Sequence, residues 1–220
     1  MKPLHTALDL EISKLKEKID FKDLDTEGLV SVMNESKYML KINGFARKDF
    51  RLILNNKTRD FYGYKENDIS HMNMNFYFQV FHPSTMVGLI KNWQFFSRND
   101  LGYLEVVYTL KNYKGNYVKV SGISKTVAWN VKGEVLYALS LMCLQDEYLL
   151  SSVREHFKFD ELSPREHQVL EKLILGQTNG QIASDLSISD KTVEKSVSSL
   201  YKKGNVKSRA EFFKILNQIM

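Results

Sequence analysis

The fold of the C-terminal part is decided by residues 181–193, which read QIASDLSISDKTV. Ala183 is small enough to let two helices approach closely, and Leu186 and Ile188 supply apolar side chains for a turn between them. Two short helices joined by such a turn are typical of DNA-binding proteins. The stretch therefore predicts a helix-turn-helix.

Capping residues extend this motif to a domain of four helices. Each helix is expected to start at a Ser or Thr whose side chain accepts a hydrogen bond from a backbone amide. In one type of start a Glu or Gln three residues later bonds back to the amide of the Ser or Thr, and in the other an acid follows in the first turn. The starts are Ser163-Pro164-Arg165-Glu166, Thr178-Asn179-Gly180-Gln181, Ser189-Asp190 and Ser208-Arg209-Ala210-Glu211. Gly176 and Gly204 follow apolar-periodic stretches, so we expect both to take the left-handed backbone that ends a helix.

The second helix of the motif has two different faces. Val193, Val197 and Leu200 recur at helical spacing and would face the core. The opposite stripe holds Lys191, Lys195, Ser198 and Lys202. Residues 191–209 include six basic side chains and one acid, Glu194, which places positive charge where DNA phosphates would lie.

Over its whole length this four-helix segment resembles the LuxR/GerE-type DNA-binding domain. The matching residues are Leu162-Ser163-Pro164-Arg165-Glu166, Val169-Leu170, Gly176, Thr178-Asn179, Gln181-Ile182-Ala183, Leu186, Ile188-Ser189, Lys191-Thr192-Val193, Lys203, Val206 and Arg209-Ala210. The resemblance implies dimers that read two half-sites, each with a recognition helix at about 190–203 in the major groove. By position it implies base contacts from Glu194, Lys195 and Ser198, and phosphate contacts from Lys191, Thr192, Lys202 and Arg209.

Two positions depart from the family pattern. Glu194 replaces a residue that is usually basic, and its carboxylate can accept from cytosine N4 but repels phosphate. Gly204 stands where a leucine usually packs the third helix, so local stability is expected to suffer. These departures leave open an alternative, a protein-interaction module whose degenerate helix-turn-helix no longer binds DNA.

Composition sets the outer bounds. The chain has 220 residues, enough for two small domains, and its net charge of +5 fits a nucleic-acid partner without proving one. Its single cysteine, Cys143, excludes an intramolecular disulfide and has apolar neighbours, so we expect a buried thiol. No secretory leader is visible and no apolar run reaches the roughly 18 residues of a membrane helix. We therefore expect a cytoplasmic protein without a membrane segment.

Apolar stripes near both ends of the chain need a partner surface. The N-terminal stripe consists of Leu8, Ile12, Leu15 and Ile19. It would pack on its own domain or on a second copy, and we favour a place near a dimer interface. The last helix carries Phe212, Phe213, Ile215, Leu216, Ile219 and Met220. Dimerisation and tighter packing within the domain are equally good interpretations of that helix.

Short β-rich runs separated by turn signals occupy the N-terminal part. The strand candidates are 38–42, 50–54, 103–110, 117–129 and 134–144. The last three form a meander with glycine-bearing turns at 112–116 and 130–133. Between 55 and 94 the sequence is aromatic-rich, with helical and loop character.

This order of elements resembles a PAS domain. The resemblance rests on Phe61-Tyr62-Gly63-Tyr64, Phe81-His82-Pro83 and Asn112-Tyr113-Lys114-Gly115-Asn116-Tyr117-Val118. It implies a five-stranded antiparallel sheet with helices over one face, used to bind a small ligand, to dimerise or to pass on a signal. The fold class is then α+β, with this PAS-like sheet followed by an all-α four-helix domain. We expect an N-terminal helix and lead-in at 1–37, the PAS-like domain at 38–147, a connecting helix at 148–160 and the DNA-binding domain at 161–220.

No cofactor is predicted, and the ligand of the PAS-like domain stays unknown. The five histidines never pair at metal-ligand spacing. A lone axial ligand at His71 or His82 remains open, although His82 precedes a proline at a helix start, which favours capping. Seven aromatics could line a pocket, but core filling is the stronger interpretation: Phe76, Tyr77, Phe78, Phe81, Trp93, Phe95 and Phe96.

Taken together, the motifs predict a transcriptional regulator and no enzyme. The chain has no P-loop, no G-x-S-x-G elbow and no H-E-x-x-H pair. Its expected partners are double-stranded DNA and a second copy of itself, with RNA polymerase as a further candidate.

Overall fold

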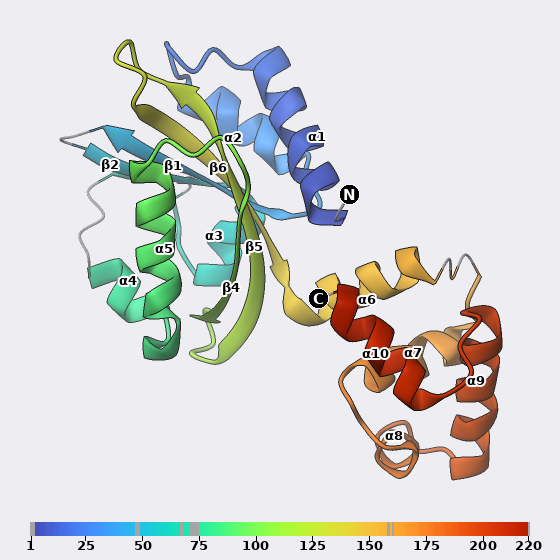
Figure 1. Cartoon of the computed structure of the whole chain (residues 1–220). Coiled ribbons are helices and arrows are strands. Elements are labelled where there is room, and N and C mark those ends of the chain that lie inside the picture. Colours follow the sequence, from blue (N-terminus) through green and yellow to red (C-terminus); the bar gives the residue numbers. More distant parts are fainter. Residues whose placement is uncertain are drawn as a thin grey trace. The chain divides into compact units, whose positions relative to one another are not determined.

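The computed structural model describes residues 3–46, 49–66, 68–70, 75–157, 159 and 161–219. The chain divides into two compact units, Met1–Gln145 and Asp146–Met220. Figure 1 shows a sheet with helices in the first unit and helices alone in the second. This confirms the α+β fold class.

The first unit is built on one antiparallel sheet. Its strands are β1 (Met39–Ala46), β2 (Asp49–Leu54), β3 (Asp68–Ser70), β4 (Leu104–Lys111), β5 (Tyr117–Trp129) and β6 (Val135–Leu144). They lie in the order β3-β2-β1-β6-β5-β4. All five predicted strands are present, and the helices between β2 and β4 complete the PAS-like connectivity.

A sixth strand was not predicted. β3 adds three residues to the edge of the sheet by pairing with β2. Three residues are too few to leave a period-two hydrophobic pattern in the sequence. The five predicted strands are confirmed, and β3 is a short addition at the edge of the sheet.

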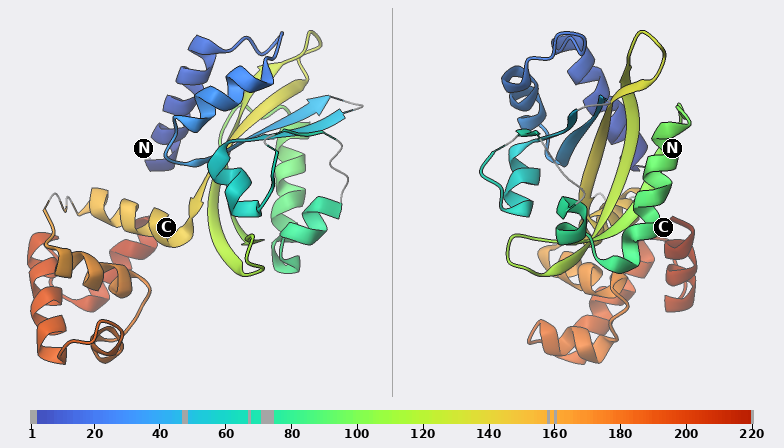
Figure 2. Two further views of the ribbon diagram at one scale, coloured as in Figure 1. Left: turned by 180° about the vertical axis from the view of Figure 1, so that it is seen from behind. Right: turned by 90° about the vertical axis from the view of Figure 1, so that its left-hand side faces the viewer.

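Helices cover both faces of this sheet, although one face was expected (Figure 2). They are α1 (Pro3–Lys18), α2 (Thr26–Asn34), α3 (Asn56–Tyr62), α4 (Asn75–Val80), the short 3-10 helix η1 (Pro83–Thr85) and α5 (Met86–Ser97). α1 contacts β5 and β6, whereas α4 and α5 contact β4. In the right-hand view the blue helices α1 and α2 lie on the opposite side of the sheet from the green α5.

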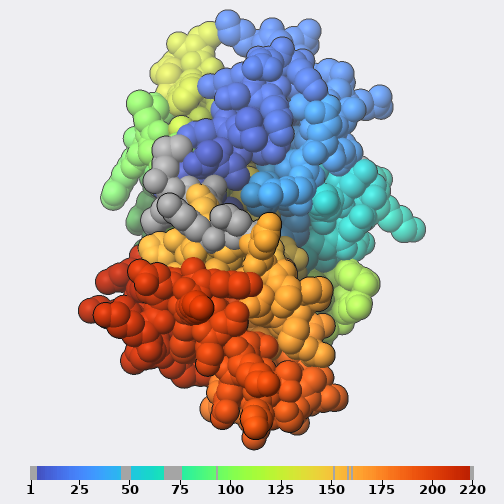
Figure 3. Space-filling view, turned by 90° about the vertical axis from the view of Figure 1, so that its right-hand side faces the viewer, coloured from blue at the N-terminus to red at the C-terminus, as the bar shows by residue number. Residues whose placement is uncertain are grey.

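The apolar stripe of α1 packs within its own unit. Leu8 and Leu15 are fully buried and Ile12 is nearly so, while Ile19 is half-buried. Figure 3 shows the blue residues of α1 and α2 as a continuous surface on this side of the unit. The stripe therefore packs on its own domain, and our preference for a dimer interface finds no support in this packing.

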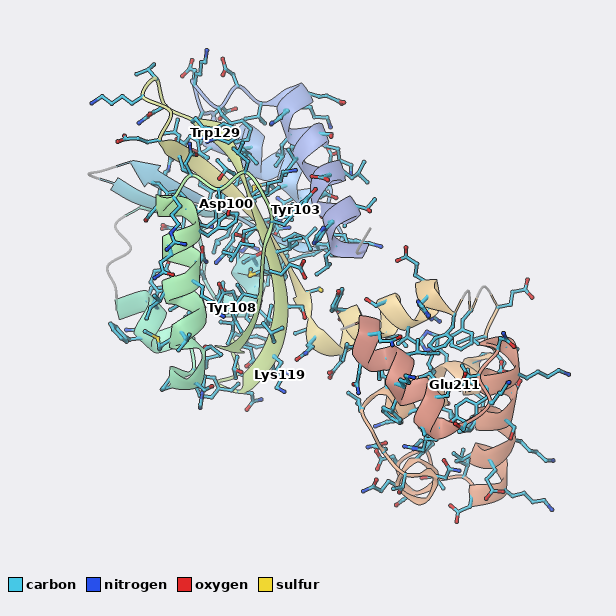
Figure 4. The ribbon with its side chains drawn as sticks, in the orientation of Figure 1. Asp100, Tyr103, Tyr108, Lys119, Trp129 and Glu211 are labelled. Carbon is cyan, nitrogen blue, oxygen red and sulfur yellow. The ribbon has the colours of Figure 1, made fainter. Side chains whose placement is uncertain are left out.

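Polar contacts also hold α1 to the sheet. The Tyr103 hydroxyl donates to Asp9, and Lys125 Nζ lies 2.9 Å from Asp9 Oδ1. Both bonds lower the pKa of Asp9, that from Tyr103 the more, and Figure 4 shows Tyr103 beside α1. On the same helix His5 stacks on Tyr103, with ring centroids 4.1 Å apart.

Most of the predicted aromatics fill the core between the sheet and α4 and α5. Phe76, Phe81 and Phe96 are buried, whereas Phe78 is exposed. Tyr77 and Phe95 are partly buried against the same apolar clusters. The side chain of Trp93 lies outside the described residues.

Cys143 and His82 take the structural roles that the sequence predicts. Cys143 is buried, as expected. His82 caps η1, because its Nδ1 accepts from the Ser84 amide at 3.2 Å. His71 lies outside the described residues.

The second unit contains five helices in its described part: α6 (Gln145–His156), α7 (Pro164–Ile174), α8 (Asn179–Asp185), α9 (Asp190–Lys203) and α10 (Arg209–Ile219). α6 starts three residues before the expected connecting helix. Its Leu149 and Val153 belong to the same apolar core as Val169, Val193 and the rest of the helix-turn-helix. α6 is thus a packed part of this unit.

The last helix also packs on this core. Phe212 and Leu216 are buried, and Phe213 and Ile215 pack against the same cluster. Packing within the domain accounts for these four side chains; the side chain of Ile219 and all of Met220 lie outside the described residues. Among the helices that the structure describes, none is long and apolar enough to span a membrane.

Candidate DNA-binding surface

The helix-turn-helix consists of α8 and α9, which begin where the caps predicted. Thr178 Oγ accepts from the Gln181 amide while the Gln181 side chain accepts from the Thr178 amide, a complete capping box. Ser189 caps α9 by accepting from the Thr192 amide at 3.2 Å. The turn between them holds Ser187 with φ of 52°, a left-handed conformation.

One face of α9 fixes its position on the domain. Val193, Val197 and Leu200 are buried and belong to the core shared with α7 and α8. Ala183 is buried, and its small side chain lets α8 lie against α9. Leu186 and Ile188 pack at the turn between the two helices. The buried face predicted from the sequence is confirmed.

The other face of α9 is open to solvent. Six exposed polar side chains lie along it: Lys191, Thr192, Glu194, Lys195, Ser198 and Lys202, and at the two ends of α9 Asp190 and Lys203 are exposed as well. We call the first six residues the recognition face. The Thr192 hydroxyl is already engaged with the Ser189 cap at 2.8 Å. The remaining side chains combine three lysines, one carboxylate and one hydroxyl on a single helical stripe.

Lys203 has a partner within the domain, although its position among the basic residues of 191–209 suggested a place near DNA. Its Nζ lies 2.8 Å from Glu166 Oε2 and donates to the Glu161 carbonyl at 3.0 Å. Ser199 Oγ donates to Glu166 Oε1 at 2.6 Å. These bonds, with that of Lys203 the strongest influence, lower the pKa of Glu166 to about 2.

Arg209 is half-buried at the start of α10. Its Nη2 donates to the carbonyl of Gln177 and, at 3.4 Å, to that of Gly176. The guanidinium also lies over the Phe213 ring, 5.3 Å from its centroid. Arg209 therefore supports the turn after α7 with part of its guanidinium.

The two glycines expected to end helices behave differently. Gly176 has φ of 83° and is left-handed, as predicted. Gly204 has φ of −83°, and the left-handed residue is Asn205 with φ of 52°. The expectation for Gly204 was wrong because asparagine, which tolerates this conformation, ends the helix one residue later.

Gly204 is small for a packing reason. A Cβ at this position would lie 3.1 Å from ring carbons of both Phe157 and Phe159. These two rings stack on each other, and Phe157 also stacks on Phe212. The phenylalanines occupy the space beside α9 that a side chain at position 204 would need.

The contacts that Glu166, Ser199, Phe157 and Phe159 make at the α9 end of the domain were not predicted from the sequence. Glu166 had a visible role as a capping residue, and its second role needs the fold. Two phenylalanines two residues apart, just before the matched domain, are a signal that could have indicated an added packing element.

Comparison with known families agrees with this geometry. Residues 160–216 match the family described as bacterial regulatory proteins, luxR family. Residues 160–216 form a luxR-family domain. The match includes all the helix-turn-helix and its flanking helices α7 and most of α10. A domain of this family belongs to a regulator and not to an enzyme, as the motifs predicted.

Solved structures show looser similarities. A phage VqmA–DPO complex is 15% identical over 87% of this chain and 86% of that chain, with a TM-score of 0.42. A Vibrio cholera VqmA–ligand–DNA complex is 16% identical over 90% of this chain and 89% of that chain, with a TM-score of 0.41. A PAS domain from Colwellia psychrerythraea is 9% identical over 54% of this chain and 94% of its own, with a TM-score of 0.40. No curated protein matches the chain significantly.

Proposed function

We propose that the protein is a sequence-specific DNA-binding transcriptional regulator that acts as a dimer. In this proposal α9 enters the major groove, which is wide enough for an α-helix. The observation that carries the proposal is the recognition face: its six polar side chains are exposed while the opposite face of α9 is buried in the luxR-family domain. Such a division between core and solvent leaves the stripe free for DNA.

Side chains near the middle of the stripe are assigned to bases. Glu194, Lys195 and Ser198 are exposed and lie on adjacent turns of α9. A carboxylate suits cytosine N4, a lysine suits guanine, and a serine hydroxyl donates or accepts. Sequence preference then depends chiefly on this trio.

Phosphate contacts are assigned to Lys191, Thr192, Lys202 and Arg209. The two lysines lie near opposite ends of α9, so they can reach phosphates on both sides of a groove. The Arg209 guanidinium donates to an internal carbonyl and keeps further N–H groups for a phosphate, and the Thr192 hydroxyl can donate to a phosphate while it accepts from Ser189. Lys203 is left out because Glu166 holds it.

The PAS-like unit is proposed to sense a small ligand or to mediate dimerisation. Two-fold arrangement of the DNA-binding domains would match a paired operator, since half-site spacing reflects the symmetry of the protein. RNA polymerase is the further protein partner that a DNA-bound regulator would contact. The proposed site of action is the cytoplasm.

A salt titration tests the DNA-binding proposal. Affinity of the full-length protein for a labelled duplex should fall linearly in a plot of log affinity against log salt, because lysines displace counterions from phosphates. A Lys191→Ala and Lys202→Ala double variant should flatten this slope. Absence of salt-dependent binding would favour the interaction-module alternative.

A further inference from the structure

The sheet of the PAS-like unit carries buried polar side chains on the face that α4 and α5 cover. Antiparallel partners point to the same side, and the register aligns Lys41 with Ser140 and Ser140 with Ser124. The next line aligns Asn43 with Ala138 and Ala138 with Thr126. We call Lys41, Asn43, Ser124, Thr126 and Ser140 the polar row.

Apolar clusters flank the polar row on both sides. Leu54, the partner of Lys41 on β2, packs with Phe76, Phe81 and Tyr108 in one cluster. Ala138 packs with Phe96 of α5 in another. Figure 4 shows Tyr108 beside α5, so the helices cover this side of the sheet. Five polar residues therefore lie in the middle of an aromatic-lined core.

Burial of the polar row is nearly complete. Ser140 is 2% exposed, Thr126 4%, Lys41 and Asn43 5% each, and Ser124 8%. Asn43 Nδ2 donates to Ser140 Oγ at 3.1 Å, and Ser140 Oγ lies 2.8 Å from Ser124 Oγ. This chain of bonds satisfies three of the five residues.

The side chains of Thr126 and Lys41, the other two members of the polar row, have no hydrogen-bond or ion-pair partner among the described residues. Thr126 Oγ1 is buried without a hydrogen bond among the described residues, as is the Tyr62 hydroxyl of the flanking cluster. Lys41 forms no ion pair with any described carboxylate. Burial lowers the pKa of Lys41 to about 8, so the ammonium still predominates at neutral pH. No described carboxylate compensates the charge of this mostly buried lysine, and such a charge is costly to keep beside an apolar core.

We propose that the polar row binds a small organic anion, a carboxylate on an apolar body, with its charge at Lys41. Asn43, the two serines and Thr126 supply hydrogen bonds to the polar end, and the aromatic side chains contact the apolar body. Ligand sites commonly combine apolar walls with a few polar groups in this way. This inference rests on the proposed function, because it names the ligand class of the unit proposed there as a sensor.

Thermal unfolding of the full-length protein with paired probes tests the inference. The probes are benzoate, phenylacetate and indole-3-acetate, each compared with its uncharged amide. At least one carboxylate should raise Tm while its amide does not, because binding to the folded state stabilises it. The inference is overturned if no carboxylate raises Tm more than its amide.

Variants tie the effect to the polar row. Lys41→Met should raise the Kd of the effective carboxylate at least about tenfold, whereas Lys119→Met, an exposed lysine on β5, should leave it unchanged. Lys41→Met should also raise Tm without ligand, since an uncompensated buried charge is removed. Thr126→Val, which keeps the shape of the side chain, should weaken binding with the fold intact. Unchanged binding in both Lys41→Met and Thr126→Val would contradict the assignment.

DNA binding of the same variants separates this inference from the proposed function. Ligand-free Lys41→Met should bind duplex DNA with the salt dependence of the unchanged protein, because the polar row lies in the other unit. DNA binding without any carboxylate effect would reject the anion site alone. Failure of the unchanged protein to bind duplex DNA would reject the proposed function instead.

Discussion

Lys203 Nζ lies 2.8 Å from Glu166 Oε2, and this ion pair joins the end of the recognition helix to the start of α7. Glu166 is buried and also closes the capping box with Ser163, so one carboxylate serves the cap, Ser199 and Lys203. The pair gives Lys203 a role in the domain itself.

Lys203→Met should therefore lower the free energy of unfolding. Loss of this ion pair should cost about 1 kcal/mol, because Lys203 is partly exposed and Glu166 keeps its bonds from Ser163 and Ser199. Urea unfolding followed by circular dichroism measures the change. Lys202→Met is the matched control, since the exposed Lys202 belongs to the recognition face, and its effect should stay within about 0.5 kcal/mol. Equal stability of the two variants would contradict a structural role for Lys203.

Acid should unfold this unit through the same carboxylate. Hydrogen bonds from Lys203, Ser199 and Ser163 lower the pKa of Glu166 from 4.5 to about 2. A depressed folded-state pKa contributes stability that is fully present above pH 4.5 and is lost as the pH falls toward about 2. Glu166→Gln should be less stable at pH 7 and should show a flatter pH dependence in that window. A variant with the same pH profile as the unchanged protein would argue against this origin.

Gly204→Ala should be destabilising by about 1–3 kcal/mol, because the added methyl group meets two stacked rings and overpacks the core. Its distance to ring carbons of Phe157 and Phe159 would be 3.1 Å. Gly180→Ala is the control, since a Cβ there meets nothing within 4 Å and should stabilise α8. The family's leucine at position 204 should become tolerated when Phe159→Ala opens the space. Thermal unfolding of Gly204→Ala, Gly180→Ala, Gly204→Leu and the double variant Gly204→Leu with Phe159→Ala decides between a packing cause and a helix-ending cause.

Much of this unit could be predicted from the sequence because its signals are local. Caps at Ser163, Thr178 and Ser189 act within three residues, and the buried stripe of α9 repeats at helical spacing. The relation of Gly204 to Phe157 and Phe159 was hidden because it joins residues more than forty positions apart, and local pattern gives no distance between them. The polar row was hidden for the same reason: its members lie on three strands and meet only through the sheet register.

Lys191→Ala and Lys202→Ala should each weaken binding to all DNA sequences alike. Removing one phosphate contact should reduce the slope of log affinity against log salt by about 1. Fluorescence anisotropy with two unrelated duplexes at several salt concentrations measures both properties. A loss confined to one duplex would instead assign that lysine to base contacts.

Glu194→Ala should change which sequence is preferred. The exposed carboxylate is assigned to a base edge, so its removal should relax discrimination at one position by about 1–3 kcal/mol, while relief of phosphate repulsion raises general affinity. Competition between operator variants measures the change. An equal effect on every sequence would remove the base-reading role of Glu194.

The central claim is that the full-length protein reads DNA as a two-fold dimer through α9. Selection of bound duplexes from a random pool, at near-physiological salt, tests it most directly. We predict enrichment of a paired motif with two-fold symmetry and half-sites about one helical turn apart, whose recovery depends on Lys195 and Ser198. Absence of any enriched motif, with the carboxylate that raises Tm present or absent, would contradict the account.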